Sequence, residues 1–174
     1  MSSLTPAYAP HQILEREVAT FLTDRDYLLG EATFHTMLPR NLAGLLKLRT
    51  SPTAQYLRAR ADRIAVHRTW PIEFEWEVKT HARLDRHDLT VELFPLALHV
   101  VKARWGVSCL YCCRVAGREF GFWVERLPPL SAILIPATVV NRAWVEQVCA
   151  LVFPSVPVRL LAQAAGGHVV ALRQ

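Results

Sequence analysis

The chain has 174 residues, of which 52% are hydrophobic and 20% are charged, and it carries a formal net charge of +5. This length and composition are typical of one folded domain and exclude a disordered chain, so we expect a single domain over residues 1–174. No apolar run reaches the roughly 18 to 20 residues that a membrane-spanning helix needs, which excludes a membrane span. Residues 1–10 do not resemble a secretory signal, and we therefore expect an intracellular protein.

Arginine dominates the basic residues, because only three of the 20 are lysines: Lys47, Lys79 and Lys102. An arginine side chain stays charged and forms paired hydrogen bonds with phosphate, so an arginine-rich basic domain is a candidate for binding nucleic acid. GC-rich coding or a high growth temperature can produce the same bias. The charge alone therefore leaves both interpretations open.

The spacing of apolar residues predicts both helices and strands in the first half of the chain. Apolar residues recur with helical spacing over residues 11–22, and Glu17 falls inside the apolar arc of that helix. We expect residues 63–67 to form a strand directly after Asp62. Apolar and charged residues alternate over residues 72–80, which predicts a further strand. One face of that strand carries Glu73, Glu75, Glu77 and Lys79.

The remaining segments favour a mixture of strands and helices. A leucine-rich segment at 41–48 indicates a short helix, and residues 53–60 suit either a helix or an extended segment. The runs 89–101 and 107–115 are apolar, and the second predicts a buried strand. The other expected elements are a turn at 116–119 followed by a strand at 120–124, a short run at 132–135, a helix at 139–153, a segment at 156–163 and a strand at 168–172. We predict an α/β fold with a central mixed sheet and flanking helices.

Four residues carry the groups that a hard cation and a phosphodiester would need: Glu17, Asp62, Glu77 and Lys79. Mg²⁺ prefers carboxylate oxygens and water, and when bound it can activate water and stabilise charge on a phosphate. Asp62 and Glu77 can meet across paired strands. Lys79 projects from the same face as Glu77, where its ammonium can orient the attacking water. Glu17 would add a further contact from the helix.

These residues resemble the signature of the PD-(D/E)xK nuclease superfamily, which is an acidic residue followed by E-x-K on an adjacent strand, often with a glutamate on the first helix. The matching residues are Asp62, Glu77-Val78-Lys79 and Glu17, and Ala61 stands where the proline of the signature would be. The resemblance covers residues 13–80. Within the superfamily, the resemblance points to a Holliday junction resolvase-like or phage-type member.

The resemblance implies a restriction-endonuclease-like fold and a Mg²⁺-dependent endodeoxyribonuclease, which is a hydrolase. It implies that Asp62 and Glu77 hold the metal, with Mn²⁺ as a substitute, and that Lys79 and Glu17 complete the catalytic set. DNA is then the partner, and a homodimer is expected because cutting both strands usually requires two sites. The apolar segments of residues 127–153 have the length to supply a dimer interface. The absence of a separate DNA-reading domain favours structure-selective or weakly sequence-selective cutting.

Basic residues around Asp62 are candidates for holding the DNA backbone: Arg58, Arg60, Arg63, Arg68 and, beyond Lys79, His81. An alternative interpretation makes them ordinary solvated surface residues. The acidic strand face likewise has an alternative, the wet side of an antiparallel sheet. Glu17 could be an edge residue that reaches solvent, and Glu15 is the other carboxylate of the helix that could support the site. Asp88 and Glu92 could replace Asp62 under a different strand order.

Two other functions remain open at this point. The first is a non-catalytic nucleic-acid-binding or assembly subunit with the same fold, and the second is a domain that binds a small molecule or a protein and whose acidic strand is merely solvated. Cys109, Cys112 and Cys113 contain a CxxC spacing but no second ligand pair for a structural zinc, so buried strand thiols are expected.

Overall fold

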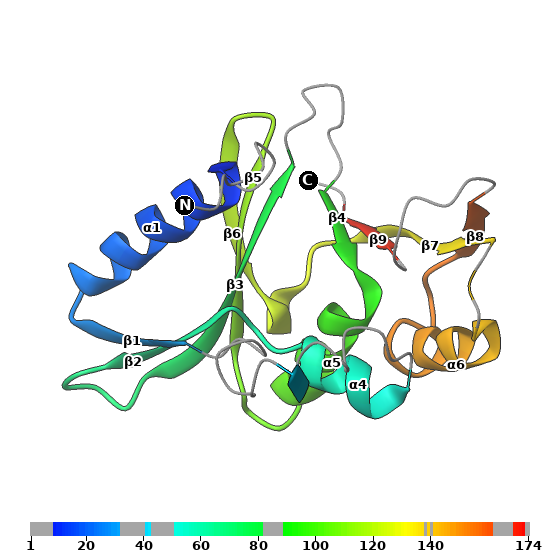
Figure 1. Cartoon of the computed structure of the whole chain (residues 1–174), viewed down its shortest axis with the longest axis horizontal. Coiled ribbons are helices and arrows are strands. Elements are labelled where there is room, and N and C mark those ends of the chain that lie inside the picture. The colour runs from blue at the N-terminus through cyan, green and yellow to red at the C-terminus, as the bar shows by residue number, and fades with distance from the viewer. Residues whose placement is uncertain are drawn as a thin grey trace.

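The computed structural model describes residues 9–31, 41–42, 51–81, 89–137, 139, 141–161 and 169–172, which form two β-sheets with helices packed against them (Figure 1). The larger sheet has the strand order β1-β2-β3-β5-β6 and the smaller has the order β4-β9-β7-β8. The strands are β1 (Tyr27–Glu31), β2 (Arg63–His67), β3 (Glu73–His81), β4 (Leu89–Glu92), β5 (Cys109–Val115), β6 (Arg118–Trp123), β7 (Leu130–Pro136), β8 (Val158–Leu161) and β9 (Val169–Leu172). The helices are α1 (Ala9–Thr23), α4 (Pro52–Arg58), α5 (Leu93–Ala103), the 3₁₀ turn η1 (Val124–Arg126) and α6 (Arg142–Val152).

The larger sheet confirms the prediction of an α/β fold with a central mixed sheet and flanking helices. Strands β1, β2 and β3 pair antiparallel, β3 pairs parallel with β5, and β5 pairs antiparallel with β6. Parallel neighbours need a crossover rather than a tight turn. The chain makes that crossover between β3 and β5, and α5 lies within it. The crossover therefore brings a helix against the sheet beside β3.

Most elements expected from the sequence are present. The helix at 11–22 is α1, the strand at 63–67 is β2, and the alternating strand is β3. Residues 53–60 contribute a helix, α4, and the apolar run at 89–101 divides into β4 and α5. The helix expected at 41–48 lies outside the described residues apart from its first two positions, which are helical.

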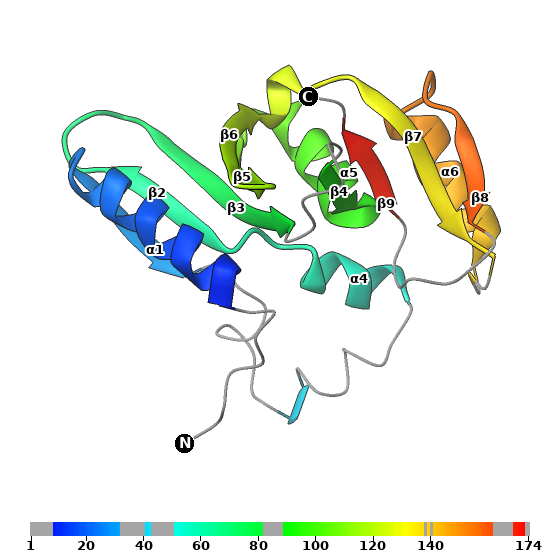
Figure 2. The ribbon, with the colours of Figure 1, turned by 90° about the horizontal axis from the view of Figure 1, so that it is seen from above.

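The two faces of β3 pack against different helices. Phe74, Trp76 and Val78 point to one face, where they form a buried cluster with Leu14 and Leu22 of α1. The alternate residues point to the opposite face. Figure 2 shows α1 and α5 on opposite sides of β3. Because one face carries the apolar residues and Thr80 and the other carries the acidic ones, the strand places Glu73, Glu75, Glu77 and Lys79 on the side of α5.

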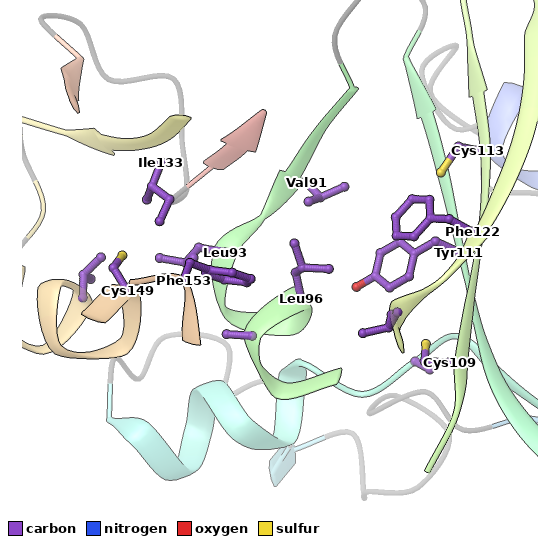
Figure 3. Packing of buried hydrophobic residues seen from close by; sticks show 14 of the residues in the cluster. Val91, Leu93, Leu96, Cys109, Tyr111, Cys113, Phe122, Ile133, Cys149 and Phe153 are labelled. Carbon is purple, nitrogen blue, oxygen red and sulfur yellow. The ribbon is translucent and has the colours of Figure 1, made fainter. Parts of the chain in front are cut away.

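The main hydrophobic cluster joins the two sheets through α5 (Figure 3). Tyr111 of β5 and Phe122 of β6 stack with ring centroids 5.1 Å apart. Leu96 of α5 and Ile133 of β7 are fully buried between the sheets, and burying each such side chain is worth about 1.5–3 kcal/mol. A core shared by both sheets suits the prediction of a single domain over residues 1–174, which stays a prediction. Within the described residues, no helix is long and apolar enough to cross a lipid bilayer.

Candidate functional site

The pairing of β2 with β3 brings Asp62 and Glu77 together. The register pairs Arg63 with Trp76, so the preceding residue, Asp62, lies opposite Glu77. The backbone N–H of Asp62 donates a hydrogen bond to Oε2 of Glu77 at 3.1 Å, and the N–H of Val78 donates to Oδ2 of Asp62 at 2.9 Å. The expectation that the two carboxylates meet across paired strands is confirmed. We refer to Asp62, Glu77 and Lys79 as the carboxylate–lysine site.

Lys79 lies on the same face of β3 as Glu77 and contacts it directly. Its Nζ is 2.5 Å from Oε1 of Glu77. The Lys79 side chain is 25% exposed and that of Glu77 only 6%, while Asp62 is half-buried. The site is therefore reached from solvent past Lys79 and Asp62, with Glu77 at its base.

Burial governs the ionisation of the site. It raises the pKa of Glu77 to about 7, an effect that the nearby charge of Asp62 increases and that of Lys79 opposes. Burial lowers the pKa of Lys79, but the carboxylates of Glu77, Asp62 and Glu92 together outweigh this effect and hold the pKa above its usual value. Glu92 on β4 also interacts electrostatically with Lys79.

The side chains of the site suit a hard divalent cation. Two carboxylates that disfavour each other's charge are stabilised when a cation binds between them. Both offer oxygen ligands, which Mg²⁺ and Mn²⁺ prefer over nitrogen or sulfur. Asp62 and Glu77 would hold such an ion, and Lys79 stands beside them as a hydrogen-bond donor.

The alternative of a wet acidic face is wrong for the part of β3 that carries the site. Glu77 is buried, and Glu75 forms an ion pair with Lys102 of α5. Only Glu73, at the start of the strand, is exposed. The sheet is covered here because β3 lies beside the parallel strand β5, and the crossover between these strands includes α5, which packs on that face.

Glu17 is not brought to the carboxylate–lysine site. The expectation that it points to the core is wrong: its side chain is 54% exposed and pairs with Arg114 of β5, which also contacts Glu119. The register pairs Arg114 with Thr80, so both point to the face opposite Glu77 and Lys79. Glu17 there lines a pocket of about 560 Å³ between α1 and the β5–β6 hairpin. The helical spacing predicts the direction in which Glu17 leaves the helix, but it does not predict the ion pair that Glu17 forms with Arg114.

The basic residues predicted around the site have different surroundings. Arg63 is half-buried and pairs with Glu15 at 2.9 Å and Glu31 at 3.3 Å. Arg68, beyond the other end of β2, is 58% exposed and lies 3.5 Å from Asp26. Arg60 is half-buried. The side chains of Arg58 and His81 lie outside the described part of the structure. Glu15, the other helix carboxylate considered, is therefore committed to Arg63.

Sequence reasoning missed two polar residues of α5, His99 and Lys102, that face β3 and β5. His99 is fully buried and its Nδ1 is 2.8 Å from the hydroxyl of Tyr111. The available signal was their spacing, because polar residues three apart in an apolar helix share one face.

The expectation for the cysteines is confirmed. All four are free, and Cys109, Cys113 and Cys149 are buried, whereas Cys112 is half-buried. Asp88, considered as an alternative ligand, is outside the described residues.

Comparison with known proteins gives distant similarity to solved structures alone. No protein-family model matches the chain, and no curated protein matches it. Among solved structures, the chain is similar to a Holliday junction resolvase, Hjc, of the archaeal hyperthermophile Archaeoglobus fulgidus. The identity is 15% and the TM-score 0.41, over 65% of this chain and 75% of that one. At this distance the function has to follow from the residues of the site itself.

Proposed function

We propose that this protein is a Mg²⁺-dependent DNA endonuclease, restriction-endonuclease-like in fold, that hydrolyses phosphodiester bonds at the carboxylate–lysine site. The observation that carries the proposal is the placement of Asp62 and Glu77 side by side across β2 and β3, with Lys79 in contact with Glu77 on the same face. Two carboxylates and a lysine are the set that a metal-assisted phosphodiester hydrolase uses.

Each residue of the site has a role in this reaction. Asp62 and Glu77 hold the cation, for which Mn²⁺ can substitute. A bound Mg²⁺ lowers the pKa of water and offsets the charge of the phosphate. Lys79 exchanges its contact with Glu77 for one with the attacking water or the phosphate, and its partial exposure leaves room for that movement. Water adds to phosphorus and gives up a proton to solvent as the bond from phosphorus to the leaving sugar oxygen breaks, and that oxygen takes up a proton from solvent.

The DNA backbone is proposed to run along the basic residues that follow and precede Asp62. Arg68 is the most accessible described member of this set. It lies six residues along the chain from Asp62, roughly 20 Å in an extended strand, so it would contact a different phosphate from the one that is cut. Arg58, Arg60 and His81 are proposed as further contacts, whereas Arg63, the other basic residue of the set, is held by Glu15 and Glu31. A homodimer would provide two sites, one for each strand of a duplex or junction.

The test is cleavage of plasmid, linear duplex, flapped and four-way-junction DNA in Mg²⁺, Mn²⁺ or EDTA. Glu77→Gln and Lys79→Met should each lower the cleavage rate by about 10²–10³-fold, because each removes one charged group from the reaction centre. Glu73→Gln is the matched control, since Glu73 is the exposed glutamate of the same strand face. It should cut at the wild-type rate.

Three results would overturn the proposal. Wild-type protein that cuts none of the substrates, cleavage that persists in EDTA, or variants that cut as fast as the wild type would each exclude a nuclease at this site. Salt-sensitive DNA binding without cleavage would instead favour the non-catalytic nucleic-acid-binding subunit.

A further inference from the structure

A second group of ligand-type side chains lies beside the carboxylate–lysine site. Glu75 of β3, His99 of α5 and Cys109 of β5 each place one ligand atom within 4.8 Å of the others. Glu75 and Cys109 are register partners on the parallel strands β3 and β5, so their side chains point to the same face, toward α5. His99 and Cys109 are 0% and 1% exposed. The group therefore forms one buried cluster contributed by three elements.

The imidazole of His99 gives independent evidence of a missing ligand. Its Nδ1 is 2.8 Å from the hydroxyl of Tyr111, a side chain that points from β5 toward α5 (Figure 3). Its Nε2 is buried and has no hydrogen-bond partner among the described residues. A buried polar atom without a partner destabilises the folded state, so such atoms are rare and call for an explanation. A metal ion bound to Nε2 would satisfy it.

The donor set indicates which metal would bind. An imidazole nitrogen, a thiolate sulfur and a carboxylate oxygen together suit Zn²⁺, whereas Mg²⁺ prefers oxygen ligands alone. Ligand atoms around one tetrahedral zinc ion lie about 3–4 Å apart, given Zn–N and Zn–S bonds of about 2.0–2.3 Å. Small side-chain rotations would bring atoms that are within 4.8 Å of each other to those separations.

We propose that Glu75, His99 and Cys109 bind a zinc ion, and that this site is distinct from the carboxylate–lysine site. His99 would bind through Nε2, while the bond from Nδ1–H to the Tyr111 oxygen fixes the tautomer. Cys109 binds as the thiolate and its proton passes to solvent. Lys102 contacts both oxygens of Glu75; it keeps one while the other turns to the metal. Water takes the fourth position.

The zinc ion would have a structural consequence for the neighbouring site. It links α5 to β3 and β5, and β3 carries Glu77 two residues beyond Glu75. The site is thus proposed to hold the helix over the strands that present the carboxylates. Because the metal binds the folded state, zinc should raise the melting temperature of the protein.

The decisive probe is Co²⁺, which replaces Zn²⁺ in such sites and reports a bound thiolate by a charge-transfer band in the near ultraviolet. Metal-free full-length protein titrated with Co²⁺ should develop this band up to one ion per chain, and Zn²⁺ should abolish it. Cys109→Ser should lack the band. Cys112→Ser is the matched control, because Cys112 lies on the same strand but faces the opposite side of the sheet; it should keep the band.

Two further variants separate this site from its neighbour and from simple misfolding. Asp62→Asn with Glu77→Gln should keep the band, even if the protein proves to have no nuclease activity. Glu75→Gln, which retains the thiol, should lower the affinity for Co²⁺ at least about tenfold. No band in the wild type, or a band that survives in folded Cys109→Ser, would overturn the proposal. So would a wild-type melting temperature that zinc leaves unchanged.

Discussion

Asp62 and Glu77, fifteen residues apart in sequence, lie opposite each other, and each side-chain carboxylate accepts a hydrogen bond from the backbone of the facing segment. The N–H of Asp62 donates to Oε2 of Glu77, and Oδ2 of Asp62 accepts from the N–H of Val78. Each carboxylate is therefore fixed by the backbone of the other strand. The separation of the two carboxylates follows from the register of β2 and β3 rather than from flexible side chains.

Asp62→Asn should separate the charge of Asp62 from its structural role. The amide oxygen of Asn can still accept from the N–H of Val78, so the free energy of unfolding should change by no more than about 1 kcal/mol. The rate of Mg²⁺-dependent DNA cleavage should nevertheless fall by about 10²–10³-fold. Urea unfolding and cleavage kinetics measure the two effects. Asp62→Ala provides the contrast, since it also loses the acceptor and should cost about 1–3 kcal/mol more stability. Equal stabilities of the two variants would contradict the structural role.

Glu77 should make the metal-free protein less stable as the pH rises. Its pKa is about 7 in the folded protein and 4.5 for an unperturbed glutamate, with burial as the main cause. Between these values the folded state holds the proton more tightly, so the free energy of unfolding falls with rising pH and levels off above about pH 7. The loss amounts to about 3 kcal/mol at 1.36 kcal/mol for each pKa unit.

Urea unfolding in EDTA across this pH range measures that loss, with Glu77→Gln as the comparison. The variant cannot ionise and should show a correspondingly smaller decline in stability. Added Mg²⁺ should restore wild-type stability above pH 7, because the ion favours the charged carboxylate. If wild type and variant decline in parallel, the proton on Glu77 is not responsible.

Glu17→Gln should have little effect on catalysis. Its carboxylate pairs with Arg114 on the face of the sheet opposite Lys79, and this exposed pair should contribute at most about 1 kcal/mol. The cleavage rate in Mg²⁺ should stay close to that of the wild type. A loss comparable to that of Glu77→Gln would show that Glu17 reaches the site after all, as the family resemblance implies.

Arg68 and Arg63 should differ in their contribution to DNA affinity. Arg68 is exposed and can reach a phosphate, so Arg68→Gln should weaken binding and reduce the slope of log affinity against log salt by about 1. Arg63 is held by Glu15 and Glu31, and Arg63→Gln should leave that slope unchanged. Fluorescence anisotropy at several salt concentrations tests both. Identical slopes for Arg68→Gln and the wild type would remove Arg68 from the proposed interface.

Leu96→Ala should weaken both sheets together. Leu96 is 0% exposed at the centre of the cluster that includes Tyr111 of β5 and Ile133 of β7. Removing its side chain should lower the free energy of unfolding by about 2–5 kcal/mol. Calorimetry should show one transition moved to lower temperature. Two separate transitions would mean that the sheets unfold as independent domains.

The sequence by itself determined the elements on which the site is built. Strict alternation in residues 72–80 reflects two faces with different surroundings, and it defined β3 and placed Glu77 and Lys79 on one face. Asp62 directly precedes β2, the shorter strand before β3 in the chain. It could be matched to Glu77 because neighbouring strands pair residue by residue. The period of apolar residues and the spacing of charged ones are local properties of the chain, so one sequence is enough to recognise them.

Only the tertiary structure decided what covers each face. The alternation of β3 is the same whether its charged side faces water or a helix, and α5 arrives there through a crossover that no local pattern specifies. Glu17 fell within the apolar arc of its helix, yet α1 packs on the face of β3 opposite Glu77 and Lys79, where Arg114, distant in sequence, pairs with Glu17. His99 and Cys109 became neighbours in the same way. Burial, charge pairing and metal coordination depend on contacts between distant segments, so they are settled when the chain folds.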